Sequence, residues 1–286
     1  MTPSVSLGAV DYLNARPLVY GIGPRPQATG PSDRGGSASL EPWTLGPGPD
    51  LSVRFDLPAV CANLLDAGEI DLGLVPTIAY FDRPDFQVVP GIGVVSAGPV
   101  ASVAVFARRP IAQVRSLALD TSSRTSVALT RILFARVFET RPACAAHRPD
   151  LGAMLEAHDA ALLIGDPALF VDHERLGAQK VDLGQAWTDW TALPFVWAFW
   201  AGRPEVADAG VVSRLQAVRD AGVAASDAIA DEYCRGDAAR QAIARRYLRE
   251  NIQYVMSDAA LDGLNRFYRE AAELGLIERA GPVRFY

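Results

Sequence analysis

The sequence contains few cysteines, and their spacing excludes the roles that cysteines most often share. Cys61, Cys144 and Cys234 are an odd number, lie far apart and form no C-x-x-C pair. This spacing indicates neither a disulfide framework nor a thiolate metal site. We therefore expect reduced thiols that are buried as small apolar side chains.

Motifs for nucleotide cofactors and for hydrolytic catalysis are also missing. The sequence has no G-x-G-x-x-G after a strand, no Walker loop and no G-x-S-x-G elbow. Its three histidines, His147, His158 and His173, lie in charged or polar stretches rather than at the ends of apolar strands. We therefore expect no histidine nucleophile relay, no metal site and no cofactor.

Positive charge is scarce. The chain has 27 Lys and Arg residues against 33 Asp and Glu residues, a net charge of −6, and Lys180 is its only lysine. Because no basic block is present, a nucleic acid or an anionic membrane would be repelled. We expect a small-molecule partner, with no nucleic-acid and no membrane partner.

The sequence pattern indicates neither an export signal nor a membrane span. Residues 1–17 contain no basic residue before Arg16 and no long apolar run, which is typical of a cytoplasmic protein. Residues 86–107 carry no charge and are long enough for a membrane span, but Gly and Pro interrupt them. This interruption favours short buried strands joined by turns.

The 286 residues, 50 % apolar and 21 % charged, are typical of a packed protein with two modest domains or one large one. Residues 23–50 are rich in Gly, Pro and Ser, which predicts a long surface loop or partly disordered insertion. Elsewhere apolar strands alternate with helical patterns, which predicts an α/β fold with a largely parallel sheet. Ligands should then collect at the carboxyl ends of the strands.

Four junctions between a strand and a helix fall into two similar pairs. In the first pair, an apolar strand meets polar residues at a helix start, as in VSLGAV-DYLNARPLVYG and SLALD-TSSRTSVALTRILFARVF. In the second pair, a strand, a turn with proline and a short helix ending in Phe follow one another, as in DLGLVPTIAYF and AALLIGDPALF. The pairs predict two lobes of related construction.

The junctions also predict the lobe boundaries. We place residues 1–97 and 203–286 in one lobe and residues 98–202 in the other, with crossings near Gly98 and Gly202 and a ligand cleft between them. Residues 192–202 read as a last buried strand, and helical patterns follow over 237–249 and 258–275. Ser257 is a candidate N-cap of the last helix.

The polar residues that follow the strands form the candidate site. Residues 120–126 hold five hydroxyls between a strand and a helix, and a helix N-terminus with such hydroxyls binds carboxylate or phosphate. Asn14 follows the first strand, while Thr77 and Asp166 occupy matching turns of the second pair of junctions. For each of these groups, an ordinary cap or turn is the alternative interpretation.

Six segments taken in order resemble one known family: YLNARPLVYG, DLGLVPTIAYF, GPVASVAVFARRP, LDTSSRTSVALTRILF, ALLIGDPALF and LPFVWAFW. Over nearly the whole chain except residues 23–50, the sequence is similar to the chorismate dehydratase family of the futalosine route to menaquinone. Two positions depart from the family pattern. Asp11 and Thr77 each stand where the family usually has Ser, and only the threonine keeps the hydroxyl.

The resemblance implies the two-lobed α/β fold of type II periplasmic binding proteins, with substrate in the interlobe cleft. It implies that Asn14, Thr77 and Asp166 lie near the substrate, and we expect these three residues to be the catalytic ones. It also places near the substrate a set of hydroxyl residues and one glycine: Ser96, Thr121, Ser122, Ser123, Thr125 and Gly165.

The reaction of this family removes water from chorismate and gives 3-[(1-carboxyvinyl)oxy]benzoate. Loss of the C3 proton spreads charge into the ring carboxylate, where the Ser/Thr loop can supply donors. Because no His or Lys lies at the junctions, we hypothesise that the substrate's enolpyruvyl carboxylate takes the proton, positioned by Asn14 and Thr77. Asp166 is the alternative base.

Two other functions remain open at this point. A 1,4-dihydroxy-6-naphthoate synthase-like enzyme would share the fold but would need a histidine base in the cleft. A non-catalytic solute-binding protein would also share the fold, because a fold alone does not imply catalysis.

Overall fold

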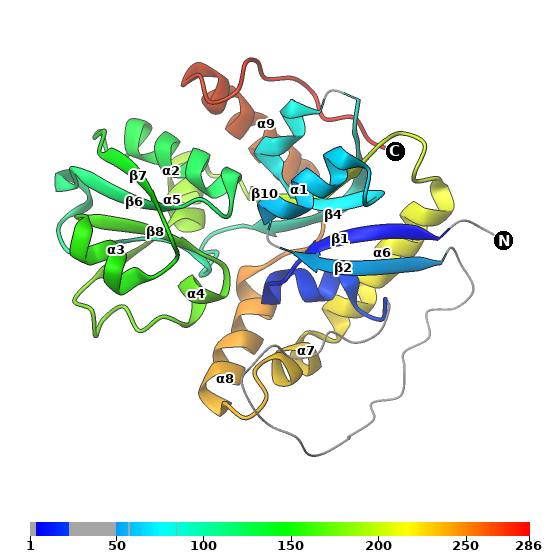
Figure 1. The fold of residues 1–286 in the computed structure, drawn as a ribbon, viewed down its shortest axis with the longest axis horizontal. Helices are drawn as coiled ribbons and strands as arrows, with labels where there is room; N and C mark the ends of the chain where they lie inside the picture. Colours follow the sequence, from blue (N-terminus) through cyan, green and yellow to red (C-terminus); the bar gives the residue numbers. More distant parts are fainter. Residues whose placement is uncertain (1–3, 23–49, 57, 84) are drawn as a thin grey trace.

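The computed structural model describes residues 4–22, 50–56, 58–83 and 85–286, and this part of the chain forms two five-stranded β-sheets (Figure 1). The first sheet contains, in spatial order, β2 (Leu51–Asp56), β1 (Val5–Val10), β3 (Leu72–Pro76), β10 (Phe195–Gly202) and β4 (Gln87–Ser96). The second contains β7 (Ala143–His147), β6 (Ser116–Asp120), β8 (Ala160–Ile164), β5 (Val103–Ala107) and β9 (Gln179–Asp182).

The two sheets share one plan. β1 runs parallel to β2 and β3, as β6 runs parallel to β7 and β8. An antiparallel strand follows in each sheet, β10 beside β3 and β5 beside β8. The junctions that the sequence pairs therefore occupy matching places in the two sheets, and the α/β class is confirmed.

Helices cover both sheets. The α-helices are α1 (Pro58–Ala67), α2 (Arg124–Arg136), α3 (Leu151–Ala157), α4 (Gly165–Phe170), α5 (Leu183–Thr191), α6 (Ala209–Ala224), α7 (Ser226–Tyr233), α8 (Ala238–Arg246) and α9 (Asp258–Glu273). Short 3-10 helices are η1 (Leu13–Val19), η2 (Thr77–Asp82) and η3 (Ile111–Gln113), and η4 (Tyr247–Asn251) is a π-helix. Ser257 caps α9 as predicted, since its side chain accepts from the N–H of Ala260.

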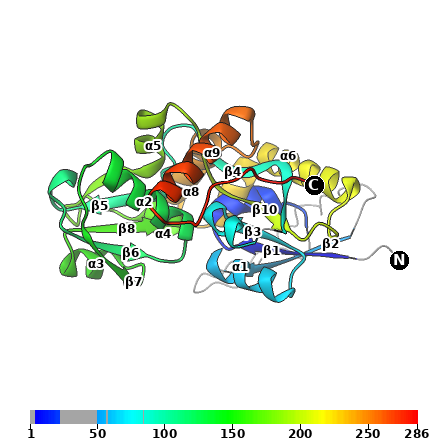
Figure 2. The same ribbon diagram turned by 90° about the horizontal axis from the view of Figure 1, so that it is seen from above.

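Two halves lie side by side in both views. The green segments, which include the second sheet and α2 to α5, form one half, and the blue, cyan and yellow segments form the other (Figures 1 and 2). Helix α9 packs on β10 of the first sheet and also reaches α2 of the second half. The C-terminal helices therefore support the first half and touch the second.

The strand β10 differs from the expected arrangement. We expect a second crossing near Gly202 from the sequence, but β10 lies between β3 and β4, where Trp200 pairs with Leu74 and Phe199 with Gly93. The chain therefore returns to the first sheet before Phe195. A fully apolar strand does not indicate by its sequence which of two sheets it joins. The remaining lobe boundaries stay a prediction.

The central strands form because they are apolar along their whole length. Every residue of β3, β5 and β8 is buried, the pattern of strands covered on both faces. The thiols of Cys61 and Cys234 are free and buried as expected, whereas Cys144 is free but exposed, because β7 is an edge strand.

Two further expectations concern the loop over residues 23–50 and the absence of a membrane-spanning segment. The expected loop over residues 23–50 falls outside them except for Asp50. In the described ranges, no helix is both long and apolar enough to cross a membrane.

Candidate functional site

A small cavity of about 60 Å³ lies between the two sheets, at the carboxyl ends of their parallel strands. Val10 ends β1, Pro76 ends β3 and Ile164 ends β8, and all three line it. The position is the one predicted for ligands, because open α/β sheets bind them beyond the carboxyl ends of the strands.

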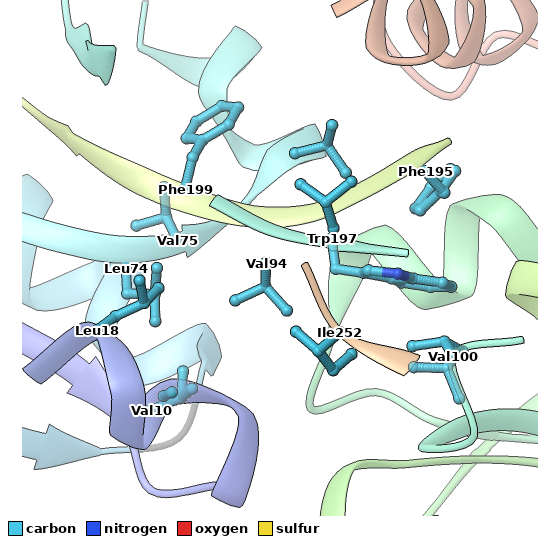
Figure 3. Close-up of a cluster of buried hydrophobic side chains, with 14 of the residues drawn as sticks. Val10, Leu18, Leu74, Val75, Val94, Val100, Phe195, Trp197, Phe199 and Ile252 are labelled. Atoms are coloured by element: carbon cyan, nitrogen blue, oxygen red, sulfur yellow. The ribbon is translucent and has the colours of Figure 1, made fainter. Parts of the chain in front are cut away.

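One wall of the cavity is apolar. It consists of aliphatic side chains, most of them from the first half, and an indole: Val10, Leu74, Val94, Val100 and Trp197. Figure 3 shows these side chains gathered around Val94, with Ile252 beside them. An apolar wall with one aromatic ring suits the flat ring of a small ligand.

The polar lining comes from both halves, and it consists of hydroxyls and one amide: Tyr12, Asn14, Ser102, Ser123 and Ser126. No charged side chain is among the residues of the described chain that line this cavity. A ligand carboxylate here would be held by hydroxyl and amide donors rather than by an ion pair.

Three of the predicted residues line the cavity: Asn14, Ser123 and Gly165. Asn14 lies in the first turn of η1, and its Oδ1 is buried without a hydrogen-bond partner in the described chain. Ser123 caps α2, where its Oγ accepts from the Ser126 N–H at 3.4 Å and from the Ser126 hydroxyl at 3.1 Å. The loop is thus both a helix cap and part of the cavity wall.

Thr77 and Thr125 meet each other between the halves instead of lining the cavity. Their Oγ1 atoms are 3.3 Å apart, and both residues are fully buried. Thr77 donates to the carbonyl of Val196 at 3.1 Å, and Thr125 Oγ1 accepts from the N–H of Ile78 at 3.2 Å. In this conformation the two hydroxyls join η2 of the first half to α2 of the second.

Three other predicted residues lie outside the lining. Ser96 is buried and accepts a hydrogen bond at 3.0 Å from the indole N–H of Trp197, which does line the cavity. The N–H and hydroxyl of Ser122 donate to Asp120 Oδ1 at 3.0 and 2.6 Å. Thr121 is exposed.

Asp166 joins the two halves. Its Oδ1 accepts from the N–H of Leu13 at 3.2 Å, and its Oδ2 accepts from the hydroxyl of Tyr233. Burial raises the pKa of Asp166 above its ordinary value, although both hydrogen bonds oppose that shift. Burial, together with the charge of Asp166, also raises the pKa of Tyr233.

Ser102 and Tyr247 are among the polar residues at the cavity that were missed from the sequence. Ser102 lines it, is 1 % exposed and lies 2.7 Å from the hydroxyl of Tyr247, which is also buried. The serine lies in the segment GPVASVAVF, whose apolar character predicts only strands. Tyr247 lies in a stretch with a helical pattern, where a buried aromatic residue is ordinary, so no local signal identifies it.

None of the three histidines lines the cavity. His147 ends β7, His158 follows α3 and His173 lies after α4. The ring nitrogens Nδ1 of His147 and His173 each lie 2.8 Å from a nearby backbone carbonyl oxygen. In the described ranges, no group of three or more His, Cys, Asp or Glu is placed to hold a metal ion.

A larger open depression, of about 480 Å³, lies on the surface where α2 and α9 meet. Two of its three arginines are already paired, since Arg136 donates to Glu270 at 2.8 Å and Arg266 lies 2.7 Å from the same carboxylate. A solvated cluster of ion pairs explains this depression, so we assign the ligand site to the smaller cavity between the sheets.

Solved structures with the same fold are numerous. A protein from Archaeoglobus fulgidus is 17 % identical, with a TM-score of 0.69 over 96 % of this chain and 98 % of that one. The periplasmic aliphatic sulphonate binding protein from Escherichia coli is 16 % identical, with a TM-score of 0.61 over 99 % and 94 %. These likenesses confirm the fold of periplasmic binding proteins that the sequence predicts.

Sequence comparison identifies the family. A curated relative, the chorismate dehydratase of Thermus thermophilus, is 31 % identical over 242 residues, which cover 78 % of this chain and 87 % of that protein. The family model described as menaquinone biosynthesis matches residues 5–273. The protein with this two-sheet fold and its hydroxyl-lined cavity therefore belongs to the menaquinone biosynthesis family.

Proposed function

We propose that the protein is a chorismate dehydratase, a hydro-lyase that converts chorismate to 3-[(1-carboxyvinyl)oxy]benzoate and water in the futalosine route to menaquinone. The observation that carries this proposal is the similarity to the Thermus thermophilus chorismate dehydratase across most of both chains. The cavity supports it, since an apolar wall faces a set of hydroxyl and amide groups.

The lining suits the chemistry of chorismate. Its ring can lie against Trp197 and the neighbouring aliphatic side chains. Its carboxylates can accept from the hydroxyls of the lining and from the free N–H groups at the start of α2. A water-poor cavity strengthens such hydrogen bonds, so donors placed at the ring carboxylate stabilise the charge that develops as the C3 proton leaves.

The base in this proposal is the substrate itself. The enolpyruvyl carboxylate takes the C3 proton, the C4 hydroxyl departs with a proton as water, and the ring becomes aromatic. Asn14, which lines the cavity, holds the carboxylate through its amide N–H. Thr77 lies behind the cavity wall in this conformation, so its contact with substrate requires the halves to separate.

Asp166 is the alternative base, but its contacts favour another role. Both of its carboxylate oxygens already accept hydrogen bonds, from Leu13 and Tyr233. These partners lie in the first half of the molecule, whereas Asp166 lies in α4 of the second. We therefore assign Asp166 to holding the two halves together.

The competing functions have less support from the site. A dihydroxynaphthoate synthase-like mechanism needs a histidine near its substrate, and His147, His158 and His173 all lie away from the cavity lining. The periplasmic binding proteins share the fold at less than 20 % identity, which carries no function across.

The proposal includes a cytoplasmic location and a small-molecule partner only. Three free cysteines support the location, because unpaired thiols persist in reducing compartments. The net charge of −6 supports the absence of nucleic-acid and membrane partners.

Incubation of the purified protein with chorismate tests the proposal. We expect a new aromatic absorbance and a product that has lost one water but keeps the enolpyruvyl ether. The Asn63→Asp variant is a suitable companion, because Asn63 is exposed on α1 and should leave the conversion intact. Unchanged chorismate after incubation with folded protein would contradict the proposed function.

A further inference from the structure

A pair of buried hydroxyls, those of Ser102 and Tyr247, lies beside the cavity. The hydroxyls of Ser102 and Tyr247 are 2.7 Å apart. Ser102 and Tyr247 are each 1 % exposed. Asn14 and Ser102 line the cavity, whereas Tyr247 lies behind them.

The contact between Ser102 and Tyr247 allows either hydroxyl to donate. Asn14, which also lines the cavity, has an Oδ1 without a hydrogen-bond partner in the described chain. In the arrangement that serves a ligand, the single proton of the Tyr247 phenol is donated to Ser102 Oγ. The remaining proton of Ser102 is consequently free to point into the cavity.

The backbone before Ser102 is held in a strained conformation. Ala101 has a φ of 62°, in the left-handed region that residues other than glycine rarely adopt. Asp182 accepts from the N–H groups of Val100 and Ala101 at 3.0 and 2.6 Å, and Lys180 donates to the carbonyl of Ala101 at 2.5 Å. Strain that the surroundings maintain in this way is typical of residues beside a functional group.

The helix that carries Tyr247 is also irregular. The α-helical pattern of α8 ends at Arg246, and the next turn, Tyr247–Asn251, is a π-helix. Single π turns occur mostly at functional sites. In the same turn, Asn251 donates to the carbonyl of Pro99 at 2.8 Å, which fixes the segment leading to Ser102. Two irregular segments therefore converge on one pair of hydroxyls.

We propose that Ser102 is a further substrate-binding residue, which donates its proton to a carboxylate oxygen of the substrate, and that Tyr247 is the positioning residue that directs this proton. The inference rests on the proposed function, because chorismate supplies the carboxylate. A carboxylate is the favoured acceptor, since the lining residues offer it donors but no cation.

A double-mutant cycle tests the inference. kcat and KM for chorismate are measured in the full chain for the wild type, Ser102→Ala, Tyr247→Phe and the double variant. We expect kcat/KM to fall about 10- to 100-fold in Ser102→Ala, the usual effect of losing a hydrogen bond to a charged group. Tyr247→Phe should cost less, and it should cost almost nothing when Ser102 is already absent, because it acts through that serine.

Tyr254→Phe is the matched control. Tyr254 is a buried tyrosine close to Tyr247 in sequence, and its hydroxyl has no hydrogen-bond partner in the described chain. The control should keep wild-type kcat/KM, and thermal unfolding should show that every variant is folded. Ser102→Thr keeps a hydroxyl and should recover part of the activity that Ser102→Ala loses.

The outcomes separate this inference from the proposed function. A wild-type protein that leaves chorismate unchanged would overturn both. An active wild type with an equally active Ser102→Ala variant would overturn the inference alone. The same is true if Tyr247→Phe lowers kcat/KM by the same factor with and without Ser102, since Tyr247 would then not act through the serine.

Discussion

At the scale of one residue, Asn14 allows the effect of a negative charge in the cavity to be tested. Its side chain lines a site in which no described lining residue is charged, and its amide N–H₂ is a hydrogen-bond donor. In Asn14→Asp, a carboxylate would replace that donor and stand beside a dianionic substrate, where a low dielectric strengthens the repulsion. We expect kcat/KM for chorismate to fall by about 100-fold or more.

The control for Asn14→Asp is the same chemical change at an exposed position. Asn63→Asp adds the same charge on the surface of α1 and should leave kcat/KM unchanged. Steady-state kinetics with chorismate compares the two variants. Full activity in Asn14→Asp would place the substrate carboxylates away from this residue.

Thr125 makes a different contact from the one its sequence position suggests. The hydroxyl-rich helix start predicts a ligand contact, but Thr125 Oγ1 accepts from the N–H of Ile78 across the two halves. In Thr125→Val that buried N–H has no acceptor, which costs about 1–3 kcal/mol. We expect chemical denaturation to show a free energy of unfolding lower by this amount.

Thr130→Val serves as the comparison for Thr125→Val. Thr130 is also fully buried in α2, but its hydroxyl donates to the carbonyl of Ser126 at 2.7 Å within the same helix. Its loss leaves no buried N–H unpaired, so the destabilisation should be smaller. Equal free energies of unfolding for the two variants would show that the contact between Thr125 and Ile78 is not maintained in solution.

At the scale of elements, the turn between β8 and α4 depends on Gly165. Its φ is 65°, and an added Cβ would lie 2.8 Å from the ring of Tyr12, which lines the cavity. Gly165→Ala therefore combines backbone strain, about 1 kcal/mol or more, with displacement of Tyr12. We expect a lower melting temperature and a lower kcat/KM.

Gly177→Ala separates the two effects, because Gly177 has a φ of 63° and an added Cβ there would meet nothing within 4 Å. This variant should show the backbone penalty in thermal unfolding while keeping its activity. If Gly165→Ala behaves like Gly177→Ala in both measurements, the close approach to Tyr12 has no role in the site.

The elements were predictable where the sequence pattern is local. The paired junctions follow from apolar runs that end in polar residues, and β1, β3, β6 and β8 occupy the matching positions that this pairing predicts. The placement of β10 was not predictable, because pairing partners are decided by long-range contacts. The π turn at Tyr247 was equally hidden, since an apolar periodicity cannot distinguish it from an α-helix.

The candidate site could be predicted only in part for the same reason. Asn14, Ser123 and Gly165 line the cavity because they directly follow strands or begin helices, which the sequence indicates. The contacts of Thr125 and Asp166 depend on how closely the two halves approach, and the sequence contains no local signal for that distance.

At the scale of the whole molecule, substitution of Asp166 distinguishes two roles for this residue. It is either a tether, which holds the two halves together, or a catalytic base. In Asp166→Asn the amide oxygen can still accept from the N–H of Leu13, and the amide N–H can donate to the hydroxyl of Tyr233. A tether therefore predicts that kcat/KM for chorismate stays within about tenfold of the wild type. Removal of a general base predicts a loss of about 100- to 10,000-fold.

Asp166→Ala completes this comparison, because it removes both contacts between the halves. The tether predicts that Asp166→Ala lowers kcat/KM more than Asp166→Asn, whereas a base predicts equal losses. Thermal unfolding of both variants shows whether the fold is retained.

The two halves must also separate for the proposed substrate to enter. The cavity holds about 60 Å³, well below the roughly 300 Å³ or more of typical small-ligand sites. The contacts of Thr125 and Asp166 join the halves beside the cavity, so they describe a closed conformation. Substrate entry would break them and closure would restore them.

The most direct test of the account is product analysis with a chain in which His147, His158 and His173 are all replaced by glutamine. Because none of them lines the cavity, we predict that this variant, in the presence of a chelator, converts chorismate to 3-[(1-carboxyvinyl)oxy]benzoate as fast as the wild type. Loss of dehydration in a folded variant that still binds chorismate would contradict the substrate-assisted mechanism and favour a histidine base.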